Sequence, residues 1–120
     1  MTPEQTLEAI VRAADSKKAR DITAIRVFEQ TTLTDYFVVM TGTSTTHIRA
    51  LSEEIELKHE VVPHHIEGVT SNWILMDYTS VVVHIFLEEA RELYAIERLW
   101  SDAQKVDVEP YLVKKEEEAK

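Results

Sequence analysis

The chain has no cysteine, two glycines and three prolines among its 120 residues. The absence of cysteine excludes disulfides, thiolate metal sites and cysteine nucleophiles, so an apolar core has to supply the stability of the fold. The chain also lacks an apolar run long enough to cross a bilayer, and it does not begin with the charged and then apolar pattern of a signal peptide. We therefore expect one small cytoplasmic domain without a membrane partner.

Positive charge is scarce as well, because 22 acidic residues stand against 13 basic ones and give a formal net charge of −9. Such a charge repels the phosphate backbone of nucleic acids and attracts basic partners. The composition therefore predicts no direct nucleic-acid specificity. A basic protein is the kind of macromolecular partner that this charge favours.

The apolar residues gather in residues 73–86, W-I-L-M-D-Y-T-S-V-V-V-H-I-F. Two runs of strand length flank residues 77–80, and a turn there folds them into an antiparallel hairpin. Because neighbouring positions in both runs are apolar, both faces of the hairpin must be covered. The polar groups that interrupt the pattern need a reason, and they belong to Trp73, Asp77, Tyr78 and His84.

Two helices are expected before this hairpin. Thr2, Pro3 and Gln5 form the reciprocal capping pattern of a first helix. Ser44 can cap a second helix, which must end before Pro63. Both helices carry apolar residues at helical spacing and therefore have one face to bury.

Three further segments have strand composition. Residues 21–29 and 36–41 must be antiparallel because their connection is too short for a crossover, and residues 64–67 can return parallel to residues 36–41. With the hairpin, this predicts an α/β domain with one mixed sheet of about five strands flanked by helices. The residues expected in its core are Val38, Val39, Leu75, Val82 and Ile85.

The spacing of apolar residues becomes helical after residue 86. It predicts one helix with a single inward face formed by Leu93, Ile96, Leu99 and Ala103. The run from residue 114 to the end is almost entirely charged. We therefore expect a domain over residues 1–104 and a partly disordered, charged tail over residues 105–120.

The histidines do not form a recognisable metal site. His59 and His64 are five residues apart instead of the four that place two ligands on one helical face, and Pro63 interrupts any helix between them. We therefore predict no metal ion and no other cofactor.

The turn at residues 42–44 lies between a strand and a helix, where free N–H groups can hold a phosphate. A nucleotidyl-transfer site would also need two carboxylates that alternate on a strand and hold magnesium, but Asp77 stands alone. A helix cap is the simpler role for Ser44, and the residues do not call for catalysis. A nucleotide-binding or nucleotidyl-transferring enzyme that uses residues 42–44 is the alternative left open.

Several blocks are similar to those of a known family. They are D-Y-F-V-V-M-T-G-T-S at 35–44, E-G at 67–68, W-I-L-M-D-Y at 73–78, V-V-V-H-I-F at 81–86, and E-E-A-R-E-L-Y-A-I-E-R-L-W-S-D-A at 88–103. In this order and spacing the chain resembles the ribosomal silencing factors, also called the Iojap family. It departs from them at Thr79 and Ser80, where the family commonly has Gly-Asp, and at Thr46, where an arginine is common.

The resemblance implies a domain related in topology to nucleotidyltransferases but without their catalytic acids, and hence a protein that is not an enzyme. It implies a partner on the large ribosomal subunit, large-subunit ribosomal protein fourteen (uL14). A factor that occupies this protein blocks association with the small subunit and represses translation.

We place the expected contact around the central hairpin. Trp73 and Tyr78 are predicted as aromatic anchors, and Asp77 is predicted to offer its carboxylate to a basic residue of the partner. His84 and Arg91, from blocks that resemble the family, are weaker candidates. Internal roles stay open, since Trp73 can cap the core and Asp77 can hold its own turn. Pairing of the chain with a second copy into a homodimer also stays open.

Overall fold

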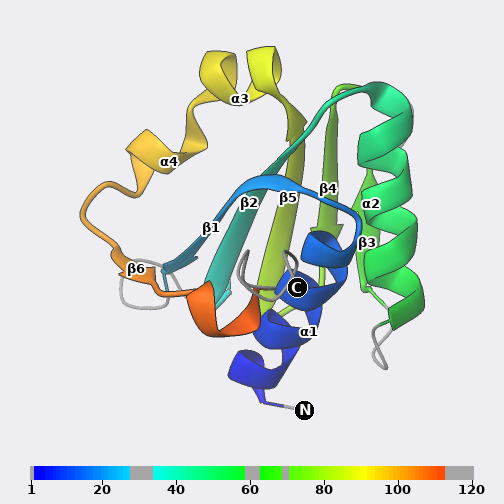
Figure 1. Ribbon diagram of the computed structural model, residues 1–120. Coiled ribbons are helices and arrows are strands. Elements are labelled where there is room, and N and C mark those ends of the chain that lie inside the picture. The colour runs from blue at the N-terminus through cyan, green and yellow to red at the C-terminus, as the bar shows by residue number, and fades with distance from the viewer. Residues whose placement is uncertain (1, 28–33, 59–62, 69–70, 113–120) are drawn as a thin grey trace, which may run out of the picture.

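The computed structural model describes residues 2–27, 34–58, 63–68 and 71–112. These residues form one sheet with helices on both sides (Figure 1). The strands are β1 (Arg20–Arg26), β2 (Tyr36–Gly42), β3 (His65–Glu67), β4 (Trp73–Asp77), β5 (Val81–Leu87) and β6 (Gln104–Val106). The helices are α1 (Pro3–Ser16), α2 (Thr45–Lys58), α3 (Glu88–Tyr94) and α4 (Ile96–Leu99), followed by the short 3-10 helix η1 (Glu109–Tyr111).

The described strands form a six-stranded mixed sheet in the order β3-β4-β5-β2-β1-β6. Strands β2 and β5 are parallel, and the other neighbouring pairs are antiparallel. The predicted α/β class, the antiparallel pair β1 and β2, and the hairpin of β4 and β5 are therefore confirmed. The sixth strand, β6, was not predicted because it has only three residues, two of them polar.

Strand β3 runs in the same direction as β2, as the sequence predicted, but β4 and β5 lie between the two. Its pairing is antiparallel, with β4. The strand parallel and adjacent to β2 is β5, which is the continuous apolar run of the hairpin. A strand buried between two neighbours and on both faces has this composition.

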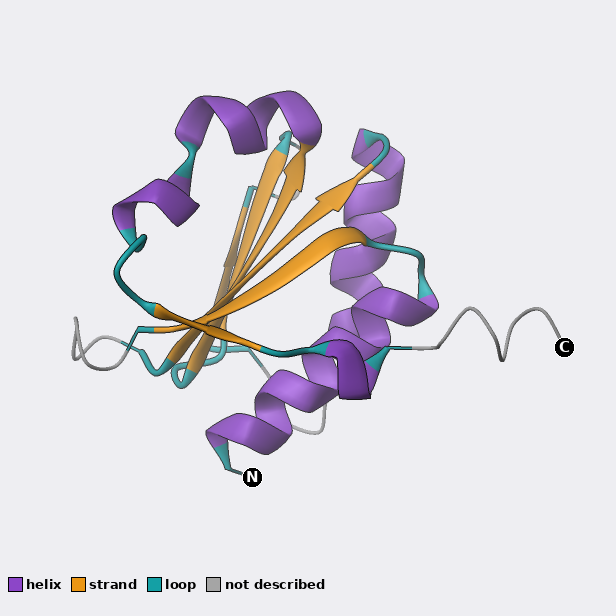
Figure 2. Ribbon diagram, turned by 60° about the vertical axis from the view of Figure 1, so that its left-hand side comes forward, coloured by secondary structure: helices purple, strands orange, loops and turns teal. Residues whose placement is uncertain are grey.

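Helices α1 and α2 cover one face of the sheet, here called the closed face (Figure 2). The capping pair of Thr2 and Gln5 starts α1, and the Ser44 hydroxyl accepts a hydrogen bond from the His47 N–H at the start of α2. The closed face holds the main core, to which the strands contribute alternate side chains. These are Ala24, Tyr36, Val38, Met40, Ile74, Met76, Val81, Val83 and Ile85.

The opposite face, here called the open face, carries the intervening side chains of the same strands. A small cluster of Val39, Phe86 and Ala90, with Trp73 and Ile96 against it, lies under α3 and α4 at one end of this face (Figures 1 and 2). Leu75 and Val82 also belong to the open face and are only partly buried. Their predicted place in the core is therefore wrong, whereas that of Val38, Val39 and Ile85 is confirmed.

The single helix predicted after residue 86 is two short helices. Ala95 has a left-handed backbone with φ of 45° and separates α3 from α4. The break changes which side chains face the sheet, so Ala90 and Ile96 point inward while Leu93 and Leu99 are 78% and 77% exposed. The predicted inward stripe that contained Leu93 and Leu99 is therefore wrong.

The folded domain extends beyond residue 104. Strand β6 pairs with β1, Val108 is buried in the main core, and Tyr111 and Leu112 pack against that core. Residues 105–112 of the predicted tail are therefore part of the domain, and residues 113–120 lie outside the described part of the chain. Among the described residues, the helices are too short and too polar to cross a membrane.

Candidate partner-binding surface

A band of aromatic rings crosses the open face. It consists of Tyr94, Trp73, His84, Phe37 and Trp100 in spatial order, and we call it the aromatic band. Successive ring centroids are 4.6, 5.9, 5.2 and 5.2 Å apart. Because the rings come from α3, β4, β5, β2 and the residue after α4, the fold and not the local sequence assembles them.

The register of the sheet explains why these rings meet. Trp73 lies opposite Phe86, and His84 is flanked by Leu75 on β4 and by Val39 on β2. Alternation along each strand then puts all of these side chains on the same face. Trp73 stacks on Phe86 at 4.9 Å, so the band rests on the small cluster under α3.

The aromatic band is partly open to solvent. Phe37, Trp73 and Trp100 are half-buried, and Tyr94 is exposed. Half-buried Leu75 and Val82 extend the apolar surface toward the turn of the hairpin, away from α3. An apolar surface of this kind on one face of a small domain is typical of a protein interaction site.

His84 is the buried centre of the band, with 6% of its surface exposed. Its Nδ1 accepts a hydrogen bond of 3.2 Å from the indole N–H of Trp73. Burial lowers the pKa of His84 to about 4, so the ring is neutral at neutral pH and carries its hydrogen on Nε2. This buried position argues against His84 as a direct contact residue and gives it the role of holding the Trp73 ring through a hydrogen bond.

Trp73 combines an internal and an external role. Its N–H is bonded to His84, and its ring packs on Phe86 and Tyr94, so it does cap a small core. The half-buried ring still presents surface on the open face. Its use as an anchor for a partner remains a prediction.

Asp77 holds the turn between β4 and β5. One carboxylate oxygen accepts a hydrogen bond of 2.8 Å from the N–H of Thr79, whose backbone is left-handed with φ of 71°. Within the described part of the chain, its other carboxylate oxygen accepts no hydrogen bond. Asp77 lies across from Val82 and not from His84, so the two do not form an acid and base pair.

Tyr78 points to the closed face instead of the open one. It is 5% exposed and belongs to the main core. Burial, with a smaller effect of Glu56, raises the pKa of Tyr78 to about 12. A side chain in this position cannot reach a partner that lies on the open face. This burial argues against Tyr78 as an aromatic anchor on the open face.

Arg91 is bound inside the domain. Its guanidinium forms two hydrogen bonds with the Glu97 carboxylate, at 2.8 and 3.1 Å. It also donates to the hydroxyls of Thr41 and Thr23 and to the backbone oxygen of Asp21. These contacts give Arg91 an internal role and argue against a direct contact of its guanidinium with a partner.

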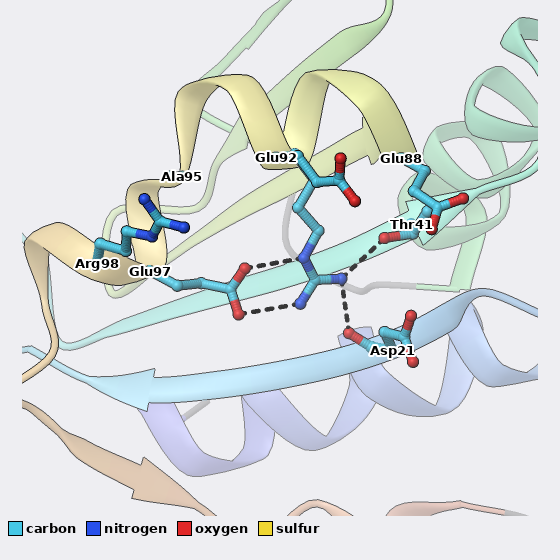
Figure 3. A pocket seen from close by; sticks show the side chains of 8 residues that line it. Asp21, Thr41, Glu88, Glu92, Ala95, Glu97 and Arg98 are labelled. Carbon is cyan, nitrogen blue, oxygen red and sulfur yellow. Dashed lines mark hydrogen bonds and ion pairs between the residues drawn. The ribbon is translucent and has the colours of Figure 1, made fainter.

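A pocket of about 620 Å³ opens beside this arginine (Figure 3). The carboxylates of Asp21, Glu88 and Glu92 lie around it, and Glu97 pairs with Arg91 at its floor. The Arg91 hydrogen bonds lower the pKa of Glu97, against the opposing effect of partial burial. The ion pair is therefore present at neutral pH.

The turn at residues 42–44 uses its polar groups internally. The Thr43 N–H donates to Nδ1 of His47 at 2.9 Å, and the other ring nitrogen of His47 lies 2.7 Å from the Lys17 backbone oxygen. A Cβ on Gly42 would collide with the Ile48 side chain, so close packing against α2 explains this glycine. These contacts leave the turn poorly prepared for a phosphate.

Metal ligands are not grouped in the part of the chain that the structure describes. His64 and His65 are exposed, and His59 and Glu60 lie outside the described residues. The absence of a metal requirement remains a prediction.

Three members of the aromatic band were not predicted as site residues, namely Phe37, Tyr94 and Trp100. Phe37 lies in a continuously apolar strand, so its face cannot be read from alternation. Tyr94 and Trp100 lie on either side of the break at Ala95, which the helical pattern does not reveal.

Comparison with known proteins gives consistent matches over nearly the whole chain. The sequence profile of a family described as "Ribosomal silencing factor during starvation" matches residues 1–120. "Ribosomal silencing factor RsfS" of Bacillus subtilis is 31% identical over 113 residues, 91% of this chain and 96% of that protein. "Mitochondrial assembly of ribosomal large subunit protein 1" of Mus musculus is 36% identical over 102 residues, 79% of this chain and 45% of that protein. A crystal structure of a Chromobacterium violaceum protein has a TM-score of 0.82 at 31% identity, covering 89% of this chain and 92% of that chain.

Proposed function

The chain belongs to the ribosomal silencing factor family, and on this premise we propose that it binds the large ribosomal subunit in the cytoplasm through large-subunit ribosomal protein fourteen. By covering that protein it prevents the small subunit from joining, and translation is repressed. This mechanism needs steric occlusion and no catalytic step.

The observation that carries the proposal is the aromatic band with its half-buried continuation at Leu75 and Val82. Aromatic side chains that are already held in place lose little conformational freedom on binding and are enriched at the centres of interfaces. The band therefore supports a docking role for the open face.

Charge supports the same kind of partner. The net charge of −9 favours approach to a basic protein and disfavours indiscriminate binding to ribosomal RNA. Asp77, at the hairpin end of the open face, has a carboxylate oxygen available for a basic side chain of the partner.

The first experiment measures co-sedimentation of the chain with purified large subunits and the inhibition of subunit joining by light scattering. We expect saturable binding and loss of joining. If the unmutated protein at saturation neither binds nor inhibits joining, the proposed function is wrong.

Two leucines give a matched test of the surface. Leu75→Ser removes apolar surface from the open face, whereas Leu57→Ser makes the same change on α2, where the side chain is exposed. We expect weaker binding only for Leu75→Ser, by roughly ten-fold as for a truncated interface residue. Equal affinities for the two variants would place the contact elsewhere.

Sedimentation of the free protein at several concentrations tests a homodimer. If the chain pairs through the open face, Leu75→Ser should weaken the dimer as well as ribosome binding, because the two associations share one surface. A dimer unaffected by Leu75→Ser would mean that self-association uses another surface.

A further inference from the structure

We call residues 88–100, which contain α3 and α4, the arm. Besides the rings of Tyr94 and Trp100, the arm places few apolar side chains against the sheet. Ala90 and Ile96 face the small cluster of the open face, while Leu93 and Leu99 point to solvent. The left-handed residue Ala95 interrupts the helix between them. Polar contacts must therefore contribute much of what holds the arm in place.

Arg91 supplies these polar contacts through its side chain, which is 14% exposed. Its Nε and Nη2 each donate a hydrogen bond to the Glu97 carboxylate. These two bonds span the break at Ala95 and fix α4 relative to α3. Nη1 donates at 2.8 Å to both the Thr41 hydroxyl and the Asp21 backbone oxygen.

The remaining bond runs from Nη2 of Arg91 to the Thr23 hydroxyl at 3.2 Å. A guanidinium has five N–H groups, and these contacts use its full donor capacity. Arg91 thus joins α3 and α4 to β1 and β2, and it has no donor left for a partner.

The positions of the two ends of the aromatic band follow from this network. Tyr94 stands three residues after Arg91 and packs on Trp73. Trp100 stands three residues after Glu97, and its backbone N–H donates a hydrogen bond of 3.3 Å to the Glu97 backbone oxygen. The Trp100 ring packs against the edge of Phe37. Any movement of the arm therefore changes both ends of the band.

We infer that Arg91 is a positioning residue for partner binding: by tying the arm to β1 and β2 it holds Tyr94 and Trp100 at the two ends of the aromatic band. This inference rests on the proposed function, since it concerns the same surface. It assigns Arg91 an effect on affinity without any contact between Arg91 and the partner.

The test compares Arg91→Met with Arg98→Met. Arg98 lines the same pocket but is exposed, and it makes none of the contacts drawn in Figure 3. Arg91→Met should weaken large-subunit binding by about ten-fold, the effect expected when two aromatic side chains must be ordered on binding. Arg98→Met should bind like the unmutated protein.

A third variant checks whether the guanidinium geometry matters. Arg91→Lys keeps the positive charge, but an ammonium group has three donors on one atom and cannot reach acceptors on Glu97, Thr41 and Thr23 together. We expect its affinity to resemble that of Arg91→Met. Full affinity in Arg91→Lys would overturn the inference, because charge alone would then be sufficient.

Two spectroscopic readouts separate positioning from a general loss of stability. In Arg91→Met the indole N–H resonance of Trp100 should shift, and the pKa of Glu97 measured by carboxyl NMR should rise. Ile10→Val or Ile10→Ala, whichever matches the melting temperature of Arg91→Met, serves as a destabilised control from the closed face. It should keep full affinity and an unchanged Trp100 resonance.

The inference is wrong if Arg91→Met shows the altered Trp100 and Glu97 signals and still binds like the unmutated protein. It is also wrong if the Ile10 control loses as much affinity, because stability alone would then explain the effect. Both results differ from failure of the proposed function, in which the unmutated protein itself does not bind large subunits.

Discussion

The two faces of the sheet are built from the same strands but differ in how they are covered. On the closed face, α1 and α2 bury alternate side chains almost completely. On the open face, α3 and α4 cover one end, and the aromatic band, Leu75 and Val82 remain partly open. Neighbouring residues of one strand therefore have different surroundings, one in the main core and the next partly exposed to solvent.

Val82 and Val83 test this difference most strongly. Val83→Asp places an unpaired carboxylate in the main core and should cost several kcal/mol, enough to unfold a small domain. Val82→Asp places it on the open face, where water reaches it, and should leave a cooperative melting transition while abolishing ribosome binding. Circular dichroism and co-sedimentation provide the two measurements.

If Val82→Asp unfolds as completely as Val83→Asp, the open face is a second closed core, and the surface proposed for the partner does not exist.

Acid should act on the open face through His84. Burial lowers the pKa of His84 to about 4 in the folded protein, below the ordinary histidine value of 6.5, so the unfolded chain binds more protons between these two pH values. The stability contribution is complete above pH 6.5 and is lost as the pH falls toward 4, by at most about 3 kcal/mol from the size of the shift. Urea unfolding at pH 7 and pH 4.5 measures it.

His84→Phe is the matching variant, because it keeps a ring in the band and removes the titration. Its stability should fall less between pH 7 and pH 4.5 than that of the unmutated protein. His64→Gln, at an exposed histidine, should leave the unmutated pH dependence intact. Equal slopes for His84→Phe and the unmutated protein would contradict the buried, neutral state of His84.

Trp73 should show how far folding and recognition overlap on the open face. Trp73→Ala removes a ring that packs on Phe86 and Tyr94, so we expect a loss of about 2 kcal/mol in stability as well as of binding. Thermal melting and co-sedimentation of Trp73→Ala and Trp73→Phe separate the two effects.

Trp73→Phe keeps an aromatic ring on Phe86 and loses only the indole N–H and some surface. It should recover most of the stability. Trp73→Phe is to be compared with Trp73→Ala at equal folded fraction. If Trp73→Phe binds large subunits with full affinity while Trp73→Ala binds poorly, the partner requires an aromatic ring at position 73.

The sequence predicted the parts of the fold that depend on local pattern. The hairpin follows from two apolar runs and a polar turn, and the helix starts follow from Thr2 with Gln5 and from Ser44. Three successive valines at residues 81–83 carry no alternation, so the face of Val82 could not be predicted. That face is decided by its register with Phe37 and Asp77.

The candidate site was less predictable because its contacts are distant in sequence. Arg91 bonds residues 70, 68 and 50 positions away. The break at Ala95 involves neither glycine nor proline, so helical spacing alone predicted one continuous helix. Asp77 and Trp73 were recognised as important, but only the structure shows how each is also used internally.

Asp77 allows the smallest and most specific test of the open face, because one oxygen holds the turn and the other is available. Asp77→Ala removes the acceptor for the Thr79 N–H and should cost about 1 kcal/mol, the usual net value of such a hydrogen bond. Asp77→Asn keeps an oxygen at this position and removes only the charge. Its melting should therefore stay close to that of the unmutated protein.

If the carboxylate pairs with a basic side chain of the partner, both variants should bind large subunits more weakly at low salt. The difference from the unmutated protein should shrink as salt is raised, because a partly exposed ion pair is screened. Co-sedimentation over a range of salt concentrations measures this. Unchanged affinity in Asp77→Asn at every concentration would assign Asp77 to the turn alone and move the charged contact with the partner to another residue.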